Sequence, residues 1–255
     1  MTGILKKYKK PLLFVLALAP IAIAGGYFTG VYSWSELTDD VKSQVLVQVG
    51  NNLNLFYLIT AAQTLMLAVV CGFFGWILSE KTGLMKPMRF EKKPLMVALG
   101  LTMLVGLLLC TDFFYFRNHL PQVATLYQEK PSFAYWMASV LYGGVMEEIM
   151  LRLFMMSLIA FLVWKIFFRR EASPPTGVII AANIIAALLF AAGHLPTTQQ
   201  MFGEITPMTL LRCFLLNGAA GLAFGYLYRR YGIQYSIMAH AGAHIVWKII
   251  WVIFI

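Results

Sequence analysis

The sequence predicts an all-α integral membrane protein, a polytopic bundle of seven to eight transmembrane helices. Of its 255 residues, 60% are hydrophobic and only 12% are charged, and the mean hydropathy is +0.74. A soluble domain of this length needs far more charge to cover its surface. Several apolar runs approach or exceed the ~20 residues that cross a bilayer core as a helix, where the backbone must satisfy its own hydrogen bonds. We therefore expect a single membrane domain over residues 1–255.

Three spans are predicted in the first half of the chain, over about 12–32, 55–78 and 94–116. The basic residues before the first run, together with the motif Ala22-x-Ala24, also fit a cleavable signal peptide. Because the run stays apolar beyond that motif, we favour an uncleaved first helix. A polar segment separates the first two spans, and a basic loop separates the second from the third.

The second half contains an unusually long apolar segment, residues 132–168. This segment is too long for a single crossing at ~1.5 Å of rise per residue. Within it, Gly143-Gly144 can mark either a break or a close contact with another helix. Further spans follow at about 176–193 and 207–228, and the last begins near residue 233. The chain crosses seven times if the long segment is one helix and eight times if it is two.

The net charge of +9 comes from short Lys/Arg clusters between the apolar runs. This distribution follows the positive-inside rule, so it predicts orientation in a lipid bilayer and no nucleic-acid partner. Seven crossings with the N-terminus in the cytoplasm place every basic cluster inside, and we expect a bacterial or archaeal plasma membrane. The three cysteines lie in apolar runs without paired spacing, which indicates buried thiols and neither a disulfide framework nor a thiolate metal site.

Ionisable residues inside apolar runs are the most informative ones, because each charge at a helix centre costs ~2.5–3.5 kcal/mol on insertion scales. Glu147, Glu148 and Arg152 lie inside the apolar stretch 140–163. Glu148 and Arg152 are four residues apart, share a helix face and can form an ion pair. Glu147 is rotated away from that face, which leaves a second carboxylate for another task. A purely structural charge cluster is the alternative, but one arginine needs only one carboxylate.

Three histidines accompany these charges in the second half of the chain. His194 follows the apolar run that contains Phe190, where a capping or interfacial role is equally expected. His240 and His244 share one helix face, a spacing that suits either a metal ion or two hydrogen bonds to an oxyanion. The segment reads His-Ala-Gly-Ala-His, so it lacks the glutamate of the zinc-protease motif. Two carboxylates, an arginine and three histidines together predict a buried hydrolytic site.

Three ordered motifs resemble those of the CAAX protease and bacteriocin-processing (CPBP, or Abi) family: Glu147-Glu148-x-x-x-Arg152, Phe190-x-x-x-His194 and His240-x-x-x-His244. A stretch of small residues from Asn217 through Gly221 and Gly225, interpreted as a helix-packing face, is similar as well. The resemblance covers about 142–244, within a catalytic core of about 132–255. It implies an eight-helix intramembrane protease that cleaves peptide bonds with a glutamate-activated water.

The resemblance also implies roles for these side chains. Glu147 is the general base, His194 helps to hold or activate the water, and Arg152 orients Glu148 or the helix. Both histidines of the third motif stabilise the oxyanion. The sequence departs from the family at His244, where Asn or Asp is usual, yet a histidine can still donate a hydrogen bond. No cofactor is implied, although zinc held by either glutamate with the histidines stays an open alternative.

Two other classes of function stay open. One is a non-catalytic membrane scaffold or immunity protein. The other is a proton-coupled transporter, since intramembrane Glu and His residues also form proton relays. Transporters often show two related halves, whereas the notable Glu and His residues here lie in the second half. The expected partners are the lipid bilayer and a peptide or protein substrate, with prenylated C-termini, bacteriocin leaders and membrane-anchored peptides all compatible.

Overall fold

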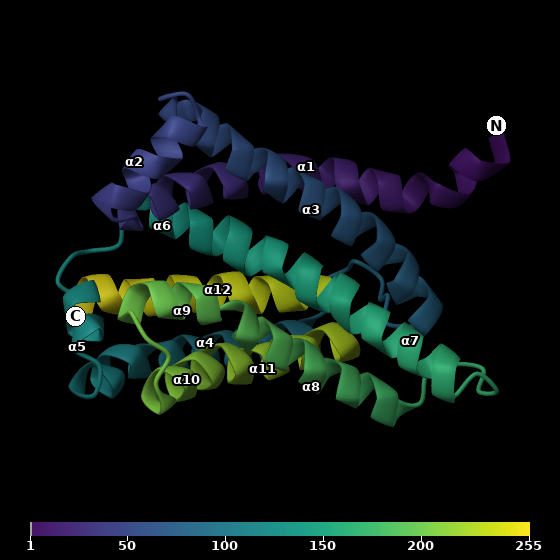
Figure 1. The fold of residues 1–255 in the computed structure, drawn as a ribbon. Coiled ribbons are helices and arrows are strands. Elements are labelled where there is room, and N and C mark those ends of the chain that lie inside the picture. The colour runs from purple at the N-terminus through teal and green to yellow at the C-terminus, as the bar shows by residue number, and fades with distance from the viewer. Residues whose placement is uncertain (1) are drawn as a thin grey trace.

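The computed structural model describes residues 2–255, with side chains from Lys6 onward, and the regular elements in that range are all helices (Figure 1). Seven helical segments within it are long and apolar enough to cross a membrane. The predicted all-α membrane bundle is confirmed. Its span count is the lower of the two expected values and differs from the eight helices that the family resemblance implies.

Three long helices form the N-terminal half: α1 (Thr2–Glu36), α3 (Leu53–Thr82) and α4 (Lys92–Phe114). Shorter elements connect or follow them: α2 (Asp39–Gln48), η1 (Phe116–Asn118) and α5 (Pro121–Leu126). The start of α3 is capped by Asn52, whose side chain accepts a hydrogen bond from the Leu55 amide. Gly83 caps its C-terminal end, where a φ of 74° favours glycine.

Residues Phe133–Phe167 form one continuous helical segment of 35 residues, so the alternative of two spans over 132–168 is wrong. Its parts are α6 (Phe133–Met137), the π-helical stretches η2 (Ala138–Glu147) and η3 (Ile149–Met156), and α7 (Ser157–Phe167). Figure 1 shows this segment running diagonally across the bundle. Tilt is how a helix longer than the bilayer thickness is accommodated, which explains why the length argument for two crossings failed.

Six elements complete the chain: α8 (Thr176–Gly193), α9 (Leu195–Phe202), α10 (Pro207–Cys213), η4 (Phe214–Gly218), α11 (Ala219–Tyr231) and α12 (Ile233–Phe254). Thr206 and Thr209 cap the start of α10 reciprocally. Gly232, with a φ of 115°, makes the tight connection between α11 and α12. These elements carry the second and third motifs.

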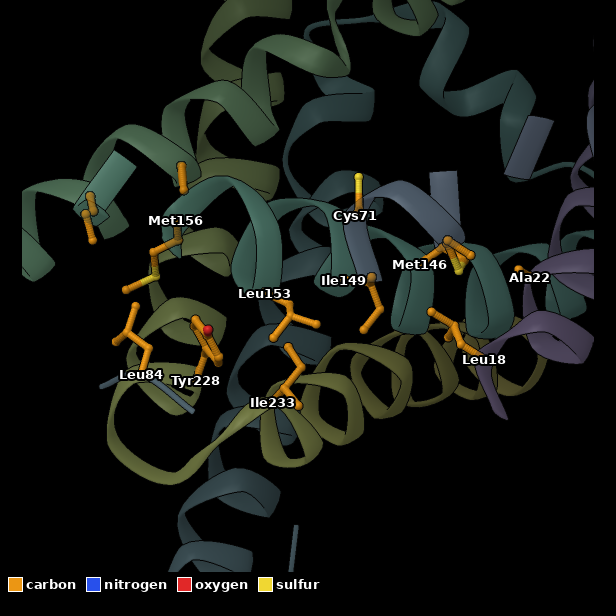
Figure 2. Packing of buried hydrophobic residues seen from close by; sticks show 14 residues of the cluster. Leu18, Ala22, Cys71, Leu84, Met146, Ile149, Leu153, Met156, Tyr228 and Ile233 are labelled. Atoms are coloured by element: carbon orange, nitrogen blue, oxygen red, sulfur yellow. The ribbon is translucent and has the colours of Figure 1, made fainter. Parts of the chain in front are cut away.

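A hydrophobic cluster fixes the long segment against its neighbours. Figure 2 shows Ile149 and Leu153 of η3 near Ile233 and Tyr228. The same cluster takes in Leu18 and Ala22 of α1 and Cys71 of α3, among other buried residues. All three cysteines are buried and free, as expected. Packing on both sides of η3 therefore sets the position of the first motif.

Gly144 confirms the expectation of a close helix contact rather than a break. A Cβ atom placed there would lie 2.6 Å from Ala241 Cα and 2.5 Å from Ala241 Cβ, so η2 and α12 approach closely at this point. Gly221 similarly lets α11 approach Ala187 of α8. The small-residue face therefore serves packing, as interpreted.

Gly144→Ala should lower the stability of the protein by ~1–3 kcal/mol, because the added methyl group must push α12 away from η2. Gly100→Ala is the matched control, since a Cβ atom there meets nothing within 4 Å. The control should gain ~0.5–1 kcal/mol, the usual helix-propensity difference between glycine and alanine. Thermal unfolding in detergent measures both; equal stability of the two variants would contradict the close contact.

Candidate active site

A cavity of about 480 Å³ lies among the helices that carry the three motifs. Glu147, His194, His240 and His244 line it. The other two predicted site residues, both from the first motif, are fully buried and do not line the cavity. The structure therefore brings all three motifs together, although they come from three separate helical segments.

The first motif lies on the π-helical part of the long segment. Glu147 ends η2, Arg152 lies in η3, and Glu148 joins the two stretches. The Glu147 side chain is 16% exposed and lines the cavity, whereas the Glu148 side chain is 0% exposed. π turns are rare and are frequently found at functional sites. The two neighbouring carboxylates consequently occupy different environments and can perform different tasks.

Glu148 is the centre of a buried polar network. Its Oε1 atom lies 3.5 Å from Arg152 Nη1, so the predicted ion pair is present. The same oxygen lies 2.9 Å from Nδ1 of His240, and the other oxygen accepts a hydrogen bond from the Ser236 hydroxyl. A buried carboxylate is stable only when its charge is paired and its lone pairs are satisfied, and these three contacts meet that requirement.

Arg152 joins two helices as well as balancing charge. Its Nη2 group donates a 2.9 Å hydrogen bond to the Gly221 carbonyl of α11. The guanidinium lies 4.8 Å from the centroid of the Phe190 ring, a cation–π contact with α8. The side chain is completely buried. Arg152 thus links the first motif to the helices that carry the second motif and the small-residue face.

His240 is held between the two glutamates. With Nδ1 bonded to Glu148, its Nε2 atom lies 3.8 Å from Oε2 of Glu147. The ring is stacked on Phe224, with centroids 4.4 Å apart and planes at 21°. These contacts fix both the position and the plane of the imidazole, with Nδ1 toward Glu148 and Nε2 toward Glu147.

His194 lies at the end of α8, where its position is compatible with both of the roles that were weighed for it. It caps the C-terminus of α8, and its Nδ1 atom lies 2.8 Å from the Phe190 carbonyl, to which it can donate. It also lines the cavity. With Nδ1 donating, the neutral ring keeps Nε2 as an acceptor, which suits a group that holds a water molecule.

His244 stacks on His240, with ring centroids 5.0 Å apart. Its Nδ1 atom is buried and has no hydrogen-bond partner among the described residues. In the same part of the chain, no three His, Cys, Asp or Glu side chains are arranged to hold a metal ion. Nδ1 of His240 is bonded to Glu148, which leaves Nε2 as the ring nitrogen that faces Glu147.

Comparison with protein families gives one match: residues 129–246 match the type II CAAX prenyl endopeptidase Rce1-like family. Residues 129–246 are an Rce1-like domain. The predicted resemblance to the CPBP family is confirmed for this part of the chain, which contains all six predicted site residues. This family indicates a protease, hence a hydrolase. Comparisons with curated proteins and with solved structures gave no match.

Two polar residues of α12 (Ile233–Phe254) were missed by the sequence reasoning. Ser236 lies four residues before His240 and bonds to Glu148. Lys248 lies four residues after His244; its Nζ group donates a 2.7 Å hydrogen bond to Ser139 and lies 3.8 Å from the centroid of the Tyr135 ring. The sequence signal for both residues was their spacing of four from the two histidines, which places them on the same helix face.

An ion pair outside the motifs forms part of the cavity wall. Arg212 of α10 bonds to Asp112 of α4 through Nε and Nη2, each 2.6 Å from a carboxylate oxygen. The Tyr127 hydroxyl lies 3.4 Å from Asp112 and accepts a hydrogen bond from Trp247. Burial, and secondly the Asp112 charge, raise the pKa of Tyr127 well above its usual range, so this hydroxyl stays neutral. Asp112 lies before residues 129–246, so helices outside the Rce1-like domain contribute to the wall of the cavity.

Proposed function

We propose that this protein is an intramembrane endopeptidase in which Glu147 activates a water molecule for attack on a peptide carbonyl. The observation that carries the proposal is the arrangement of two carboxylates around one imidazole. Glu148 bonds to Nδ1 of His240, while Glu147 lies 3.8 Å from Nε2 and reaches the cavity. One carboxylate positions the histidine, and the other is available to a water molecule.

The proposed hydrolysis consumes one water molecule, and Glu147 carries the proton between the water and the leaving group. Glu147 takes a proton from the water molecule while the water oxygen forms a bond to the peptide carbonyl carbon. The carbonyl oxygen then becomes an oxyanion. When that intermediate collapses, the C–N bond breaks and Glu147 returns the proton to the leaving nitrogen. Such general acid–base catalysis contributes ~10²–10⁴-fold in rate. A free carboxylate and a free amine result.

His240 donates to the oxyanion only if its ring carries both protons, because Nδ1 already donates to Glu148. That form gives a neutral cluster when Glu147 is ionised. Glu147 and Glu148 supply two negative charges, while Arg152 and a protonated His240 supply two positive charges. A neutral cluster is what a low-dielectric membrane interior favours, because an uncompensated charge there is costly. Glu148 and Arg152 are positioning residues in this scheme, since both are buried behind the cavity wall.

The remaining two histidines complete the site. His194, fixed by its bond to the Phe190 carbonyl, orients the water for attack. His244 is the second oxyanion donor, since it lines the cavity beside His240. Two donors aimed at the developing negative charge are the usual arrangement in acyl transfer.

Incubation of the purified protein with a peptide library separates this proposal from a non-catalytic scaffold. Cleavage by the wild-type protein that Glu147→Gln abolishes supports the protease. Binding of peptides without cleavage, unchanged in the variant, favours the scaffold. The transporter alternative receives no support from the Glu147–His240–Glu148 arrangement, which lies in a single half of the chain.

His244→Asn should retain substantial activity without added zinc, because the amide keeps a hydrogen-bond donor where this family usually has Asn or Asp. His244→Ala is the matched control and should lose ~10²–10³ in rate, the effect of removing one oxyanion donor. Activity assays with elemental analysis of the purified protein check this. Stoichiometric zinc together with an inactive His244→Asn protein would overturn the metal-free mechanism, because an amide is a poor replacement for an imidazole ligand.

A further inference from the structure

The basic residues of the chain are gathered at one end of the helix bundle. Of the 20 lysines and arginines, 14 lie at the helix ends and loops where α1 begins, α3 and α7 end, and α11 meets α12. These 14 are Lys6, Lys7, Lys9, Lys10, Lys81, Lys86, Arg89, Lys92, Lys93, Lys165, Arg169, Arg170, Arg229 and Arg230. We call this the basic end. Figure 1 shows the loop after α7 at this end, and α2, α5 and the C-terminus at the other.

The opposite end has few positive charges. Lys42, Arg117 and Lys130 are the basic residues of its loops and short helices, and Arg212 is paired with Asp112. The positive-inside rule places Lys/Arg-rich segments in the cytoplasm, and it is counted over short loops such as these. The basic end therefore faces the cytoplasm, and the end with α2 and α5 faces the other side of the membrane.

The active-site cavity reaches the end that lacks basic clusters. Three of the residues that line the cavity are exposed: Glu36 of α1, and Thr197 and Gln200 of α9. Within the described part of the chain, none of the 14 residues of the basic end lines this cavity. The cavity extends from these exposed residues to Glu147 and His240. Its entrance and the basic end are thus on opposite sides of the bundle.

From this geometry we propose that peptide substrates enter the active site from the non-cytoplasmic face of the membrane. The inference rests on the proposed protease function and adds a substrate class to it: peptide segments of exported or membrane-anchored proteins that are exposed on that face. A prenylated C-terminus that stays in the cytoplasm lies at the basic end and does not reach the entrance.

The lining of the cavity suits an unfolded peptide. Ser33 and Glu36 of α1, Thr197 and Gln200 of α9, and Asn217 of η4 supply polar groups along it. An extended peptide brings backbone N–H and C=O groups that each cost several kcal/mol if left unpaired in hydrocarbon. These side chains offer such groups hydrogen bonds on the way from the entrance to Glu147.

Single introduced cysteines test the side of access in the full-length protein. Gln200→Cys marks the entrance, Ala138→Cys marks the buried cavity wall, and Arg170→Cys marks the exposed loop at the basic end. A small membrane-impermeant, charged thiol reagent is added to intact cells and, separately, to inside-out membrane vesicles. Wild-type protein is the blank, because its three native cysteines are buried.

We expect Gln200→Cys and Ala138→Cys to react in intact cells, and Arg170→Cys to react only in inside-out vesicles. Reaction of Gln200→Cys or Ala138→Cys only in inside-out vesicles would overturn the proposal. So would an Ala138→Cys that reacts solely with a lipid-soluble maleimide, since that pattern means entry from the bilayer. Labelling needs no proteolytic activity, so this test can fail while the proposed protease function stands, and the reverse also holds.

Discussion

Glu147→Gln should leave the protein folded and lower the rate of peptide cleavage by at least ~10²–10⁴-fold, the contribution of a general base. The amide keeps the shape of the side chain but cannot take a proton from water. Glu147 makes no direct contact with the Glu148–Arg152 pair in the hydrogen-bond network, so that network should persist. Single-turnover assays on a verified substrate measure the chemical step, and the loss should appear in kcat more than in KM.

Glu171→Gln is the matched control for this change, because Glu171 is exposed in the loop after α7, far from the cavity. It should cleave at the wild-type rate. Thermal unfolding in detergent should give similar midpoints for both variants and the wild-type protein. Wild-type turnover by Glu147→Gln would remove Glu147 as the base and leave the mechanism without a proton acceptor.

Arg152→Ala should destabilise the protein by ~3–5 kcal/mol, because it leaves the Glu148 carboxylate buried without its cation. The change also removes the hydrogen bond to the Gly221 carbonyl and the contact with the Phe190 ring. Activity should fall in the fraction that stays folded, since Glu148 then no longer holds His240 in place. Denaturation in detergent measures the stability.

Arg170→Ala is the control, an exposed arginine whose removal should change stability by less than ~0.5 kcal/mol. If Arg152→Ala fails to fold, Arg152→Lys provides a second measurement, because it keeps the charge and loses the hydrogen-bonding fork. Wild-type thermal stability of Arg152→Ala would show that the pair with Glu148 does not stabilise the fold.

The sequence was sufficient to predict the membrane bundle and the residues that gather at the site. Helical spacing alone placed Glu148 with Arg152 and His240 with His244, because i, i+4 neighbours share a face whatever surrounds them. The family resemblance supplied the link between these pairs and His194. What spacing cannot supply is the contact of Glu148 with His240 and Ser236, which depends on how two distant helices pack.

The π-helical stretches were also beyond the sequence reasoning. Propensity and hydrophobic period do not separate an i→i+5 turn from an α turn, so Ala138–Met156 was expected to be ordinary helix or a break. The prediction of a possible second crossing over residues 132–168 failed for a related reason. Length predicts whether a helix can span the membrane, but its tilt is set by neighbours, and Gly144 against Ala241 is one such contact.

The first helix contributes to the cavity although it lies outside the Rce1-like domain. Thr29, Tyr32, Ser33 and Glu36 of α1 line the cavity, whereas the family match begins at residue 129. A change in these side chains alters what can pass the entrance without touching Glu147 or His240. Residues outside the matched domain therefore help to decide what enters the cavity, so proteins that share the proposed chemistry can differ in substrate through the first helix.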